Sequence, residues 1–220
     1  YDAVASVVKS GLLNGAPALI TASVGGTCRS GNATYCVHDT PYARAINDVW
    51  DLGVPVVVAA GNSGDDACFY TPGATKNAIN VGSTDVDDNV VSHSNYGACI
   101  DVMAPGKDIP SAAASSIVGN EYEEFVDDDT NDYRIMSGTS MAAPAVAGII
   151  AQYAEAMGLG SAARPAVDAM LLGATKNVLK KTNYRCRTNN LIPRAPNDVD
   201  HAPVTDRKYV PPSCALPRER

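Results

Sequence analysis

A serine at the start of an apolar, helix-forming stretch is the residue best placed to do chemistry. Ser140 lies within residues 137–144, which read SGTSMAAP, and the apolar run 145–151 follows. Gly138 permits a close backbone approach, and Pro144 is expected in the first helical turn, where its missing N–H has no partner. The positive field at a helix N-terminus favours negative charge beside such a serine. This pattern predicts a nucleophile, with an N-capping serine on a core helix as the alternative.

The string Gly-Thr-Ser-Met-Ala-x-Pro at residues 138–144 is long and specific. It resembles the nucleophile signature of the subtilases, a superfamily of serine proteases, and is most similar to the proteinase K and aqualysin-like branch. The family usually has a histidine after the proline, where this chain has Ala145, but that histidine is not catalytic. The resemblance implies a serine endopeptidase in which Ser140 attacks the scissile carbonyl. It also implies an α/β fold, a three-layer α/β/α subtilisin-like arrangement with a mainly parallel central sheet, completed by an upstream segment not in this chain.

A second polar residue follows the clearest predicted strand. Residues 54–60 form a continuous apolar run, which suits a central parallel strand covered on both faces, and Asn62 comes soon after it. An asparagine at the carboxyl end of such a strand can donate its side-chain amide to an oxyanion, while a turn asparagine is the alternative. The subtilases supply this group from an Ala-Ala-Gly-Asn segment, matched here by residues 59–62. The resemblance therefore implies that the Asn62 side chain and the N–H of Ser140 hold the oxyanion.

Glycines after another predicted strand indicate where a substrate peptide could bind. Residues 18–22 are predicted to form a buried strand that leads into Ser-Val-Gly-Gly at 23–26, where glycines keep backbone N–H and C=O groups accessible. A plain turn is the alternative. A matching Ser-Leu-Gly-Gly segment in the subtilases pairs with the peptide as an added strand, which implies an open pocket that prefers apolar or aromatic side chains. The implied substrate-binding residues are Ser23, Val24, Gly25, Ala59, Ala60, Gly61 and Thr139.

Further helices and strands that could position these residues are spaced along the chain. Apolar residues recur at helical spacing in 1–13 and in 41–52. Residues 78–82 read as a strand, and 163–172 suit a helix after the serine motif. Residues 121–132 carry seven carboxylates, which is typical of a solvated loop, with a second calcium site as the alternative.

Length and charge narrow the class of protein. The 220 residues suffice for one domain with a sizeable core, and residues 1–195 are interpreted as the C-terminal portion of a subtilisin-like catalytic domain. Residues 196–220 are interpreted as a Pro-rich extension. The net charge of −7 argues against nucleic acid and anionic membranes as partners. No apolar run approaches the roughly 18 residues that a membrane span needs, and the start at Tyr1 has no basic segment of a signal peptide.

Six cysteines indicate an oxidising compartment. Their even number, without any Cys-x-x-Cys spacing, favours disulfides over zinc. A glycosylation sequon at Asn32 agrees with a secreted or extracellular protein. The resemblance to the aqualysin-like enzymes implies a bridge between Cys68 and Cys99. The other candidate pairs are Cys28 with Cys36 in a local loop, and Cys186 with Cys214 at the C-terminal extension.

The same branch of the family binds calcium, and its ligands have counterparts here. By similarity they are the carboxylate of Asp101 and the main-chain carbonyls of Lys76 and Ala78. Calcium prefers hard oxygen ligands, which this set provides. The resemblance therefore implies a structural Ca²⁺ site, and an exposed aspartate at the end of a strand is the alternative.

The residues that would activate Ser140 are missing from the sequence. A serine hydroxyl is a poor nucleophile until an oriented base removes its proton. In the subtilases the Asp and His motifs precede the substrate strand, and neither motif occurs here. The three histidines, His38, His93 and His201, stand in other contexts. We therefore expect a heterodimer made from a zymogen cut before Tyr1, in which a companion N-terminal chain supplies Asp and His.

The sequence thus predicts a secreted endopeptidase that acts on peptide or protein substrates only with its companion chain. The alternative is a catalytically inert subtilase fragment or a subtilase-derived binding protein. Retention of both Ser140 and Asn62 argues against that alternative, because a decayed site has no chemical reason to keep both. A generic α/β ligand-binding domain would need a glycine-rich phosphate loop, and the sequence has none.

Overall fold

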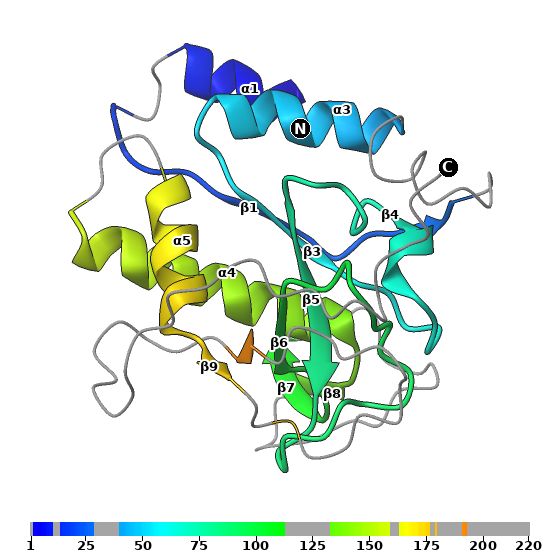
Figure 1. Ribbon diagram of the computed structural model, residues 1–220. Coiled ribbons are helices and arrows are strands. Elements are labelled where there is room, and N and C mark those ends of the chain that lie inside the picture. Colours follow the sequence, from blue (N-terminus) through cyan, green and yellow to red (C-terminus); the bar gives the residue numbers. More distant parts are fainter. Residues whose placement is uncertain are drawn as a thin grey trace.

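A parallel sheet lies at the centre of the molecule (Figure 1). The computed structural model describes residues 2–10, 14–28, 40–112, 133–158, 163–176, 179 and 191–192. Four strands pair in the order β1-β3-β5-β6, and each neighbouring pair is parallel. Their bounds are β1 Ile20–Ala22, β3 Val56–Ala59, β5 Ala78–Thr84 and β6 Val102–Pro105.

The two middle strands explain why the apolar runs in the sequence are continuous. Every residue of β3 and β5 is buried, because helices cover both faces of the sheet. The register pairs Val56 with Ala78 and Ala59 with Val81, so the carboxyl ends of the two strands lie at the same edge. Asn62 follows that end of β3, which is where an α/β sheet presents its functional loops.

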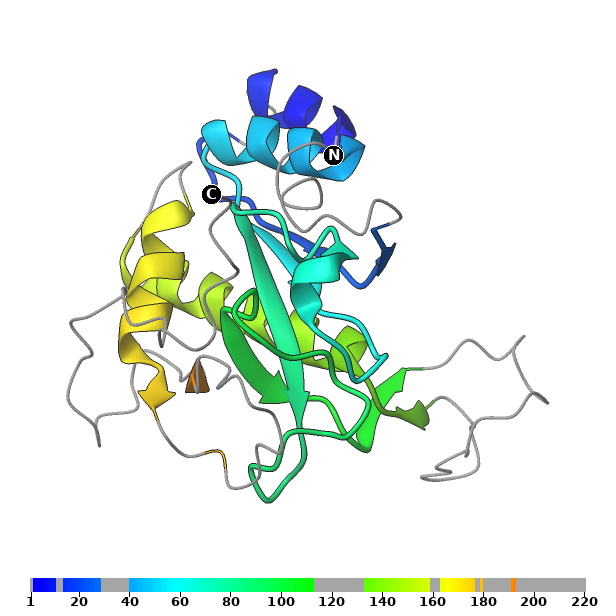
Figure 2. The ribbon, with the colours of Figure 1, turned by 45° about the vertical axis from the view of Figure 1, so that its right-hand side comes forward.

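Figure 2 shows helices on both sides of the sheet. Alternate residues of the strands face these two helical layers. Val57 and Val81 belong to the core that α4 and α5 cover, whereas Val56 and Val58 pack on the side of α3 and α1. The arrangement is a three-layer α/β/α fold, which confirms the predicted fold class. The helix bounds are α1 Asp2–Lys9, α3 Pro41–Asp51, α4 Thr139–Ala156 and α5 Arg164–Gly173.

The ends of α3 show how local sequence sets an element. The hydroxyl of Thr40 accepts the N–H of Ala43 at 3.0 Å, and Pro41 occupies the first turn. After the helix, Gly53 adopts φ +86°, a conformation that favours glycine. Arg164 of α5 then lies over the Trp50 ring of α3, with its guanidinium carbon 4.9 Å from the ring centroid. These contacts tie the two helical layers together beside the sheet.

The prediction for Pro144 was wrong. The helix α4 begins at Thr139, so Pro144 lies in its second turn rather than its first. A proline there removes the N–H that would bond the carbonyl four residues earlier, which is the carbonyl of Ser140. That carbonyl instead accepts the hydroxyl of Ser23 at 2.8 Å. The proline therefore leaves an acceptor on the serine-bearing turn for a partner outside the helix.

Short elements surround the sheet. The described part of the chain contains one helical turn of 3₁₀ type, η1, after β3, and three small antiparallel pairs. The strands β7 and β8 pair on either side of the acidic run 121–132, which lies outside the described residues. The bounds are η1 Ala67–Phe69, β2 Gly26–Thr27 with β4 Tyr70–Thr71, β7 Ile109–Ala112 with β8 Tyr133–Met136, and β9 Thr175–Lys176 with β10 Leu191–Ile192.

One predicted disulfide is confirmed and others lie beyond the described residues. Cys68 and Cys99 are bonded, with 5.2 Å between their α-carbons. Cys28 is buried and disulfide-bonded. Among the helices that the structure describes, none combines the length and apolar character needed to cross a bilayer. The predictions that fall outside the described residues concern Asn32, Cys36, His38, Cys186, His201, Cys214 and the extension 196–220.

Candidate active site

Ser140 lies in the first turn of α4, which points its N-terminus at the carboxyl edge of the sheet. Gly138 is the N-cap residue, with φ +156°, and it makes no side-chain cap bond. The alternative of an N-capping Ser140 is therefore excluded. A main-chain hydrogen bond joins this turn to the segment after β6, because the N–H of Gly138 donates to the carbonyl of Gly106 at 2.7 Å. A half-buried hydroxyl is thus presented on a fixed helical turn in the positive field of the helix.

Thr139 connects this turn to Asn62. The N–H and the hydroxyl of Thr139 both donate to Oδ1 of Asn62, at 2.9 and 3.0 Å. The same hydroxyl accepts the N–H of Gly61 at 3.1 Å, which leaves its own proton for Asn62. Because a main-chain N–H can only donate, the atom that faces Thr139 has to be Oδ1. The orientation of the Asn62 amide is therefore determined, and its Nδ2 lies on the other side.

Two N–H donors remain free beside the Ser140 turn. Within the described residues, no acceptor is bonded to Nδ2 of Asn62 or to the N–H of Ser140. Nδ2 lies against Gly138, where the β-carbon of any larger residue would come within 3.1 Å of it. A pair of oriented donors of this kind can stabilise negative charge that develops on a carbonyl oxygen during attack by a nucleophile.

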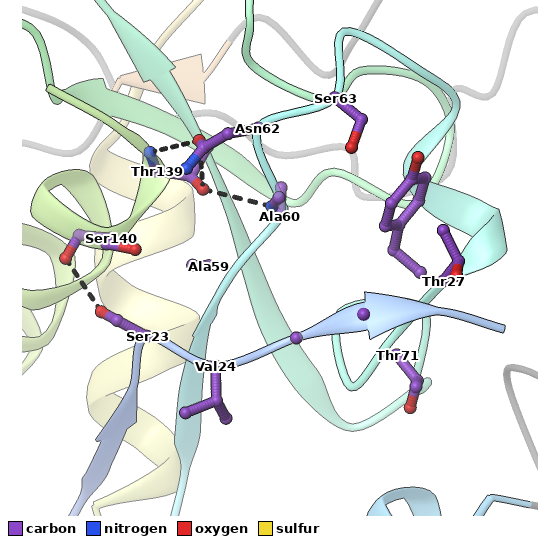
Figure 3. Close-up of a pocket in the computed structure, with 14 residues that line it drawn as sticks. Ser23, Val24, Thr27, Ala59, Ala60, Asn62, Ser63, Thr71, Thr139 and Ser140 are labelled. Carbon is purple, nitrogen blue, oxygen red and sulfur yellow. Dashed lines mark hydrogen bonds between the residues drawn. The ribbon is translucent and has the colours of Figure 1, made fainter.

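A cavity of about 410 Å³ opens in front of these donors (Figure 3). All the predicted substrate-binding residues line it, together with both predicted catalytic residues. Figure 3 shows Ser140 at one end of this cavity and Thr27 and Thr71 at the opposite end. The predicted residues that line the cavity are Ser23, Val24, Gly25, Ala59, Ala60, Gly61, Asn62, Thr139 and Ser140.

The far end of the cavity was missed by the sequence predictions. It is closed by the β2 and β4 pair, in which Thr27 lies opposite Tyr70 and Gly26 opposite Thr71. The hydroxyl of Tyr70 lies 3.4 Å from a carboxylate oxygen of Asp65. Local sequence carries no signal for a pairing between segments more than 40 residues apart, so only the fold reveals these lining residues. Those missed are Thr27, Ser63, Tyr70 and Thr71, whereas Gly26 belongs to the segment 23–26 that the sequence matched to the substrate strand.

The segment predicted to pair with a substrate is exposed. Ser23, Val24 and Gly25 follow β1 at the edge of the sheet, and the Val24 side chain is 50% exposed. The hydroxyl of Ser23 joins this segment to the first turn of α4 by donating to the Ser140 carbonyl at 2.8 Å. The backbone of this segment is accessible for pairing with an extended peptide.

No histidine lines the cavity in the part of the chain that the structure describes. His93 is the described histidine, and its main-chain carbonyl accepts the N–H of Gly64. His38 and His201 lie outside the described residues. The cavity is therefore lined by a serine hydroxyl and oriented N–H donors, with no histidine from the described residues.

The predicted calcium ligands lie at the starts of β5 and β6. Lys76 is in the turn before β5, Ala78 is its first residue, and Asp101 precedes β6. One carboxylate oxygen of Asp101 accepts the N–H of Asn80 at 2.8 Å. The described residues contain no cluster of three His, Cys, Asp or Glu side chains that could hold a metal ion. A site here would depend on main-chain carbonyls, as the predicted donor set does.

Known proteins resemble this chain in sequence and in fold. The Subtilase family model matches residues 2–198. The extracellular serine proteinase of Thermus sp. (strain Rt41A) is 42% identical over 164 residues, which cover 74% of this chain and 34% of that protein. Subtilisin-like protease 1 of Pseudogymnoascus destructans is 41% identical over 145 residues, which cover 63% of this chain and 32% of that protein. The chain spans about a third of the length of these curated relatives.

A solved structure has the same architecture. The crystal structure of a cold-adapted subtilisin-like serine proteinase aligns with a TM-score of 0.64 and 30% identity, over 87% of this chain and 60% of that one. Together with the family match over most of the sequence, it confirms the predicted resemblance: this chain belongs to the subtilase family.

Proposed function

We propose that this chain carries the nucleophile and the oxyanion donors of a subtilisin-like serine endopeptidase. The observation that supports this most directly is the arrangement of Ser140 and Asn62 at one cavity, with the Asn62 amide oriented by Thr139. A spare pair of N–H donors next to a serine has a chemical use in acyl transfer. It has no use in a domain that only binds a ligand through apolar contacts.

Each group of the site has a role in the proposed reaction. The hydroxyl oxygen of Ser140 forms a bond to the scissile carbonyl carbon, while an imidazole takes its proton. The carbonyl oxygen becomes an oxyanion that the N–H of Ser140 and Nδ2 of Asn62 stabilise. The protonated imidazole then gives its proton to the leaving amine as the peptide bond breaks, and water hydrolyses the remaining ester.

The substrate would lie along the exposed segment 23–25. Its backbone pairs there as an added strand, and the side chain before the scissile bond enters the cavity beside residues 59–61. We propose a broad preference for apolar or aromatic side chains at that position. Cleavage of peptides that differ only at this side chain measures the preference, and equal rates for apolar and charged side chains would contradict it.

We propose that the catalytic Asp and His come from a companion N-terminal chain of the same precursor. The position of β1 supports this, because in the described part of the chain it pairs only with β3 and forms an edge of a sheet otherwise buried. A parallel sheet is normally covered or continued at such a strand. The relatives are also about three times as long as the matched segment.

Intact mass spectrometry of the native protein, with and without a fluorophosphonate probe, tests both parts of the proposal. The expected result is probe addition at Ser140 and co-purification of a second polypeptide. Labelling of Ser140 in one continuous longer chain would support the endopeptidase and overturn the two-chain arrangement. If the protein is folded and Ser140 stays unlabelled while the probe reacts with a control protease, the result would support the inert subtilase fragment or binding protein instead.

Calcium and secretion are part of the same proposal. Asp101 and the carbonyls of Lys76 and Ala78 are all oxygen donors, and a bound Ca²⁺ would join the starts of two strands and so add stability. A drop in melting temperature on addition of a chelator, reversed by Ca²⁺ but not by Mg²⁺, is the expected result.

We propose an extracellular location because the Cys68–Cys99 disulfide persists best in an oxidising compartment, and one relative is named an extracellular proteinase.

A further inference from the structure

The loop that carries Asn62 has no regular secondary structure of its own. We call residues 60–65 the oxyanion loop; it follows the end of β3 and turns sharply at Gly61. Figure 3 shows Ala60, Asn62 and Ser63 along this loop, beside the start of α4. Thr139 fixes the Asn62 side chain, but the backbone beneath it must also be held. A misplacement of about 1 Å at a catalytic group can reduce a rate about 10²-fold, so the source of this rigidity matters.

Asn95 lies in a segment between β5 and β6, and its side chain hydrogen-bonds to the oxyanion loop on both sides of Asn62. Its Nδ2 donates to the carbonyl of Ala60 at 2.7 Å, before Asn62 in the chain. Its Oδ1 accepts the N–H of Ser63 at 3.0 Å and the N–H of Asp65 at 3.2 Å, both after Asn62. Each end of one planar amide therefore fixes one arm of the loop.

These bonds require an asparagine in one orientation. The groups that face Oδ1 are main-chain donors, and the group that faces Nδ2 is a main-chain acceptor, so neither an aspartate nor a flipped amide would satisfy all of them. Asn95 is fully buried, with no exposed side-chain surface. Loss of the amide would leave the buried carbonyl of Ala60 without its donor and the N–H groups of Ser63 and Asp65 without this acceptor, and the cost is largest for the buried carbonyl.

The backbone around Asn95 adds a second layer of contacts. The N–H of Asn95 donates to the carbonyl of Gly61 at 2.9 Å, and the N–H of Gly64 donates to the carbonyl of His93 at 2.8 Å. Gly61 has φ +102°, and a β-carbon there would collide with the Asn95 amide. The glycine thus provides both the turn and the space that Asn95 occupies. The Cys68–Cys99 disulfide joins the same two segments a few residues further on.

We propose that Asn95 is a positioning residue for the oxyanion donor Asn62. It contacts neither Ser140 nor the cavity, and it acts by holding the loop from which Asn62 projects. The inference rests on the proposed function and deepens it, because it assigns the accuracy of the oxyanion site to a buried amide on a neighbouring segment. Its consequence is kinetic: loss of Asn95 lowers turnover and leaves substrate binding along segment 23–25 in place.

The test is a double-mutant cycle on the complete enzyme, with kcat expressed per site titrated by the fluorophosphonate probe. The variants are Asn95→Ala, Asn62→Ala and the double variant, with Asn95→Ser in place of Asn95→Ala if the latter does not fold. We expect Asn95→Ala to lower kcat about 10²-fold with little change in KM. In the Asn62→Ala background, the same substitution should lower kcat by less than about twofold, since the donor that Asn95 positions is already gone.

A matched control separates positioning from stability. Asn80 is fully buried like Asn95, and its Nδ2 donates to the carbonyl of Cys99 at 2.7 Å, so its amide bonds outside the oxyanion loop. Asn80→Ala should lower the melting temperature and retain kcat per titrated site. An unchanged kcat in Asn95→Ala, or an equal loss with and without Asn62, overturns the inference. Absence of hydrolysis by the unsubstituted enzyme overturns the proposed function itself. A fully active enzyme whose Asn95 variants behave like wild type overturns only the inference about Asn95, so the two failures can be told apart.

Discussion

The two walls of the cavity are built in opposite ways. The wall that carries Asn62 and Thr139 joins three segments distant in sequence, and its supporting residues Thr139 and Asn95 are fully buried. The wall at segment 23–26 is exposed throughout and is tied to the nucleophile turn by the hydroxyl of Ser23. The difference agrees with the two tasks proposed for these walls, because charge stabilisation needs donors fixed in advance, whereas capture of an extended peptide needs accessible backbone.

This comparison predicts that substitutions in the wall with buried supports reduce turnover, whereas those in the exposed wall at segment 23–26 act mainly on substrate binding. The largest effect is expected at Ser140, the proposed nucleophile. Ser140→Ala should reduce kcat by about 10⁶-fold, because no other group in the cavity can form the covalent intermediate. Hydrolysis of a chromogenic peptide by the complete enzyme measures it. Residual activity far above this level, with the protein free of wild-type contamination, would show that Ser140 is not the nucleophile.

Asn62 is expected to have the next largest effect. Removal of its amide in Asn62→Ala should lower kcat about 10²- to 10³-fold with KM nearly constant, since the donor acts on the transition state. Steady-state kinetics with the same peptide provide both values. A rise in KM at constant kcat would instead place Asn62 among groups that bind substrate and transition state equally.

Thr139→Val removes the hydroxyl that bridges Gly61 and Asn62 while it keeps the shape of the side chain. The main-chain N–H of residue 139 still donates to Asn62, so the expected loss in kcat is about tenfold, the value of one hydrogen bond. Thr139→Ser, which retains the hydroxyl, is the matched control and should restore most of the activity. Equal activity of the valine and serine variants would contradict the role given to this hydroxyl.

Ser23→Ala tests the exposed wall. The variant loses the bond to the Ser140 carbonyl, an acceptor that Pro144 leaves free inside α4. We expect a reduction of kcat/KM by about fivefold, mainly through KM, because the segment still offers its backbone to the peptide. A loss in kcat as large as that of Asn62→Ala would show that the two walls do not differ as the structure suggests.

The smallest expected effect lies in the loop 85–89, away from both walls. The main-chain N–H of Asn89 donates to the Asp85 carboxylate at 2.9 Å and lowers the pKa of that carboxyl in the folded protein. A lowered folded-state pKa adds stability above the unfolded-state pKa, and this stability is lost as the pH falls through the folded-state value. Asp85→Asn should therefore lower the melting temperature slightly at neutral pH, with kcat unchanged. The difference from wild type should disappear in strong acid.

Much of this site could be predicted because its chemistry is local in sequence. Ser140 lies at the start of one stretch with a clear apolar pattern and Asn62 follows another, and the buried strand β3 ends close to the predicted position. The start of α4 was misjudged, because an irregular turn and a first helical turn share the same small residues, and Pro144 was misplaced as a result. Helix boundaries depend on contacts such as that between Gly138 and Gly106, which spacing does not reveal.

The residues that the sequence could not reveal act across long separations. Tyr70 reaches the cavity through its pairing with Thr27, and Asn95 reaches the oxyanion loop from a segment more than 30 residues away. An asparagine in a loop reads as a turn residue until its partners are known. Only the fold distinguishes a turn asparagine from one that holds a catalytic loop.

The central claim is that Ser140 and Asn62 form one oxyanion site, and a crystal structure of the complete enzyme with a peptide phosphonate bound to Ser140 tests it most directly. The account predicts that a phosphonyl oxygen lies about 2.7–3.1 Å from both the N–H of Ser140 and Nδ2 of Asn62, with an imidazole within hydrogen-bonding reach of the Ser140 oxygen. An adduct whose oxygen faces solvent while the Asn62 amide points elsewhere, or one without any nearby imidazole, would contradict it.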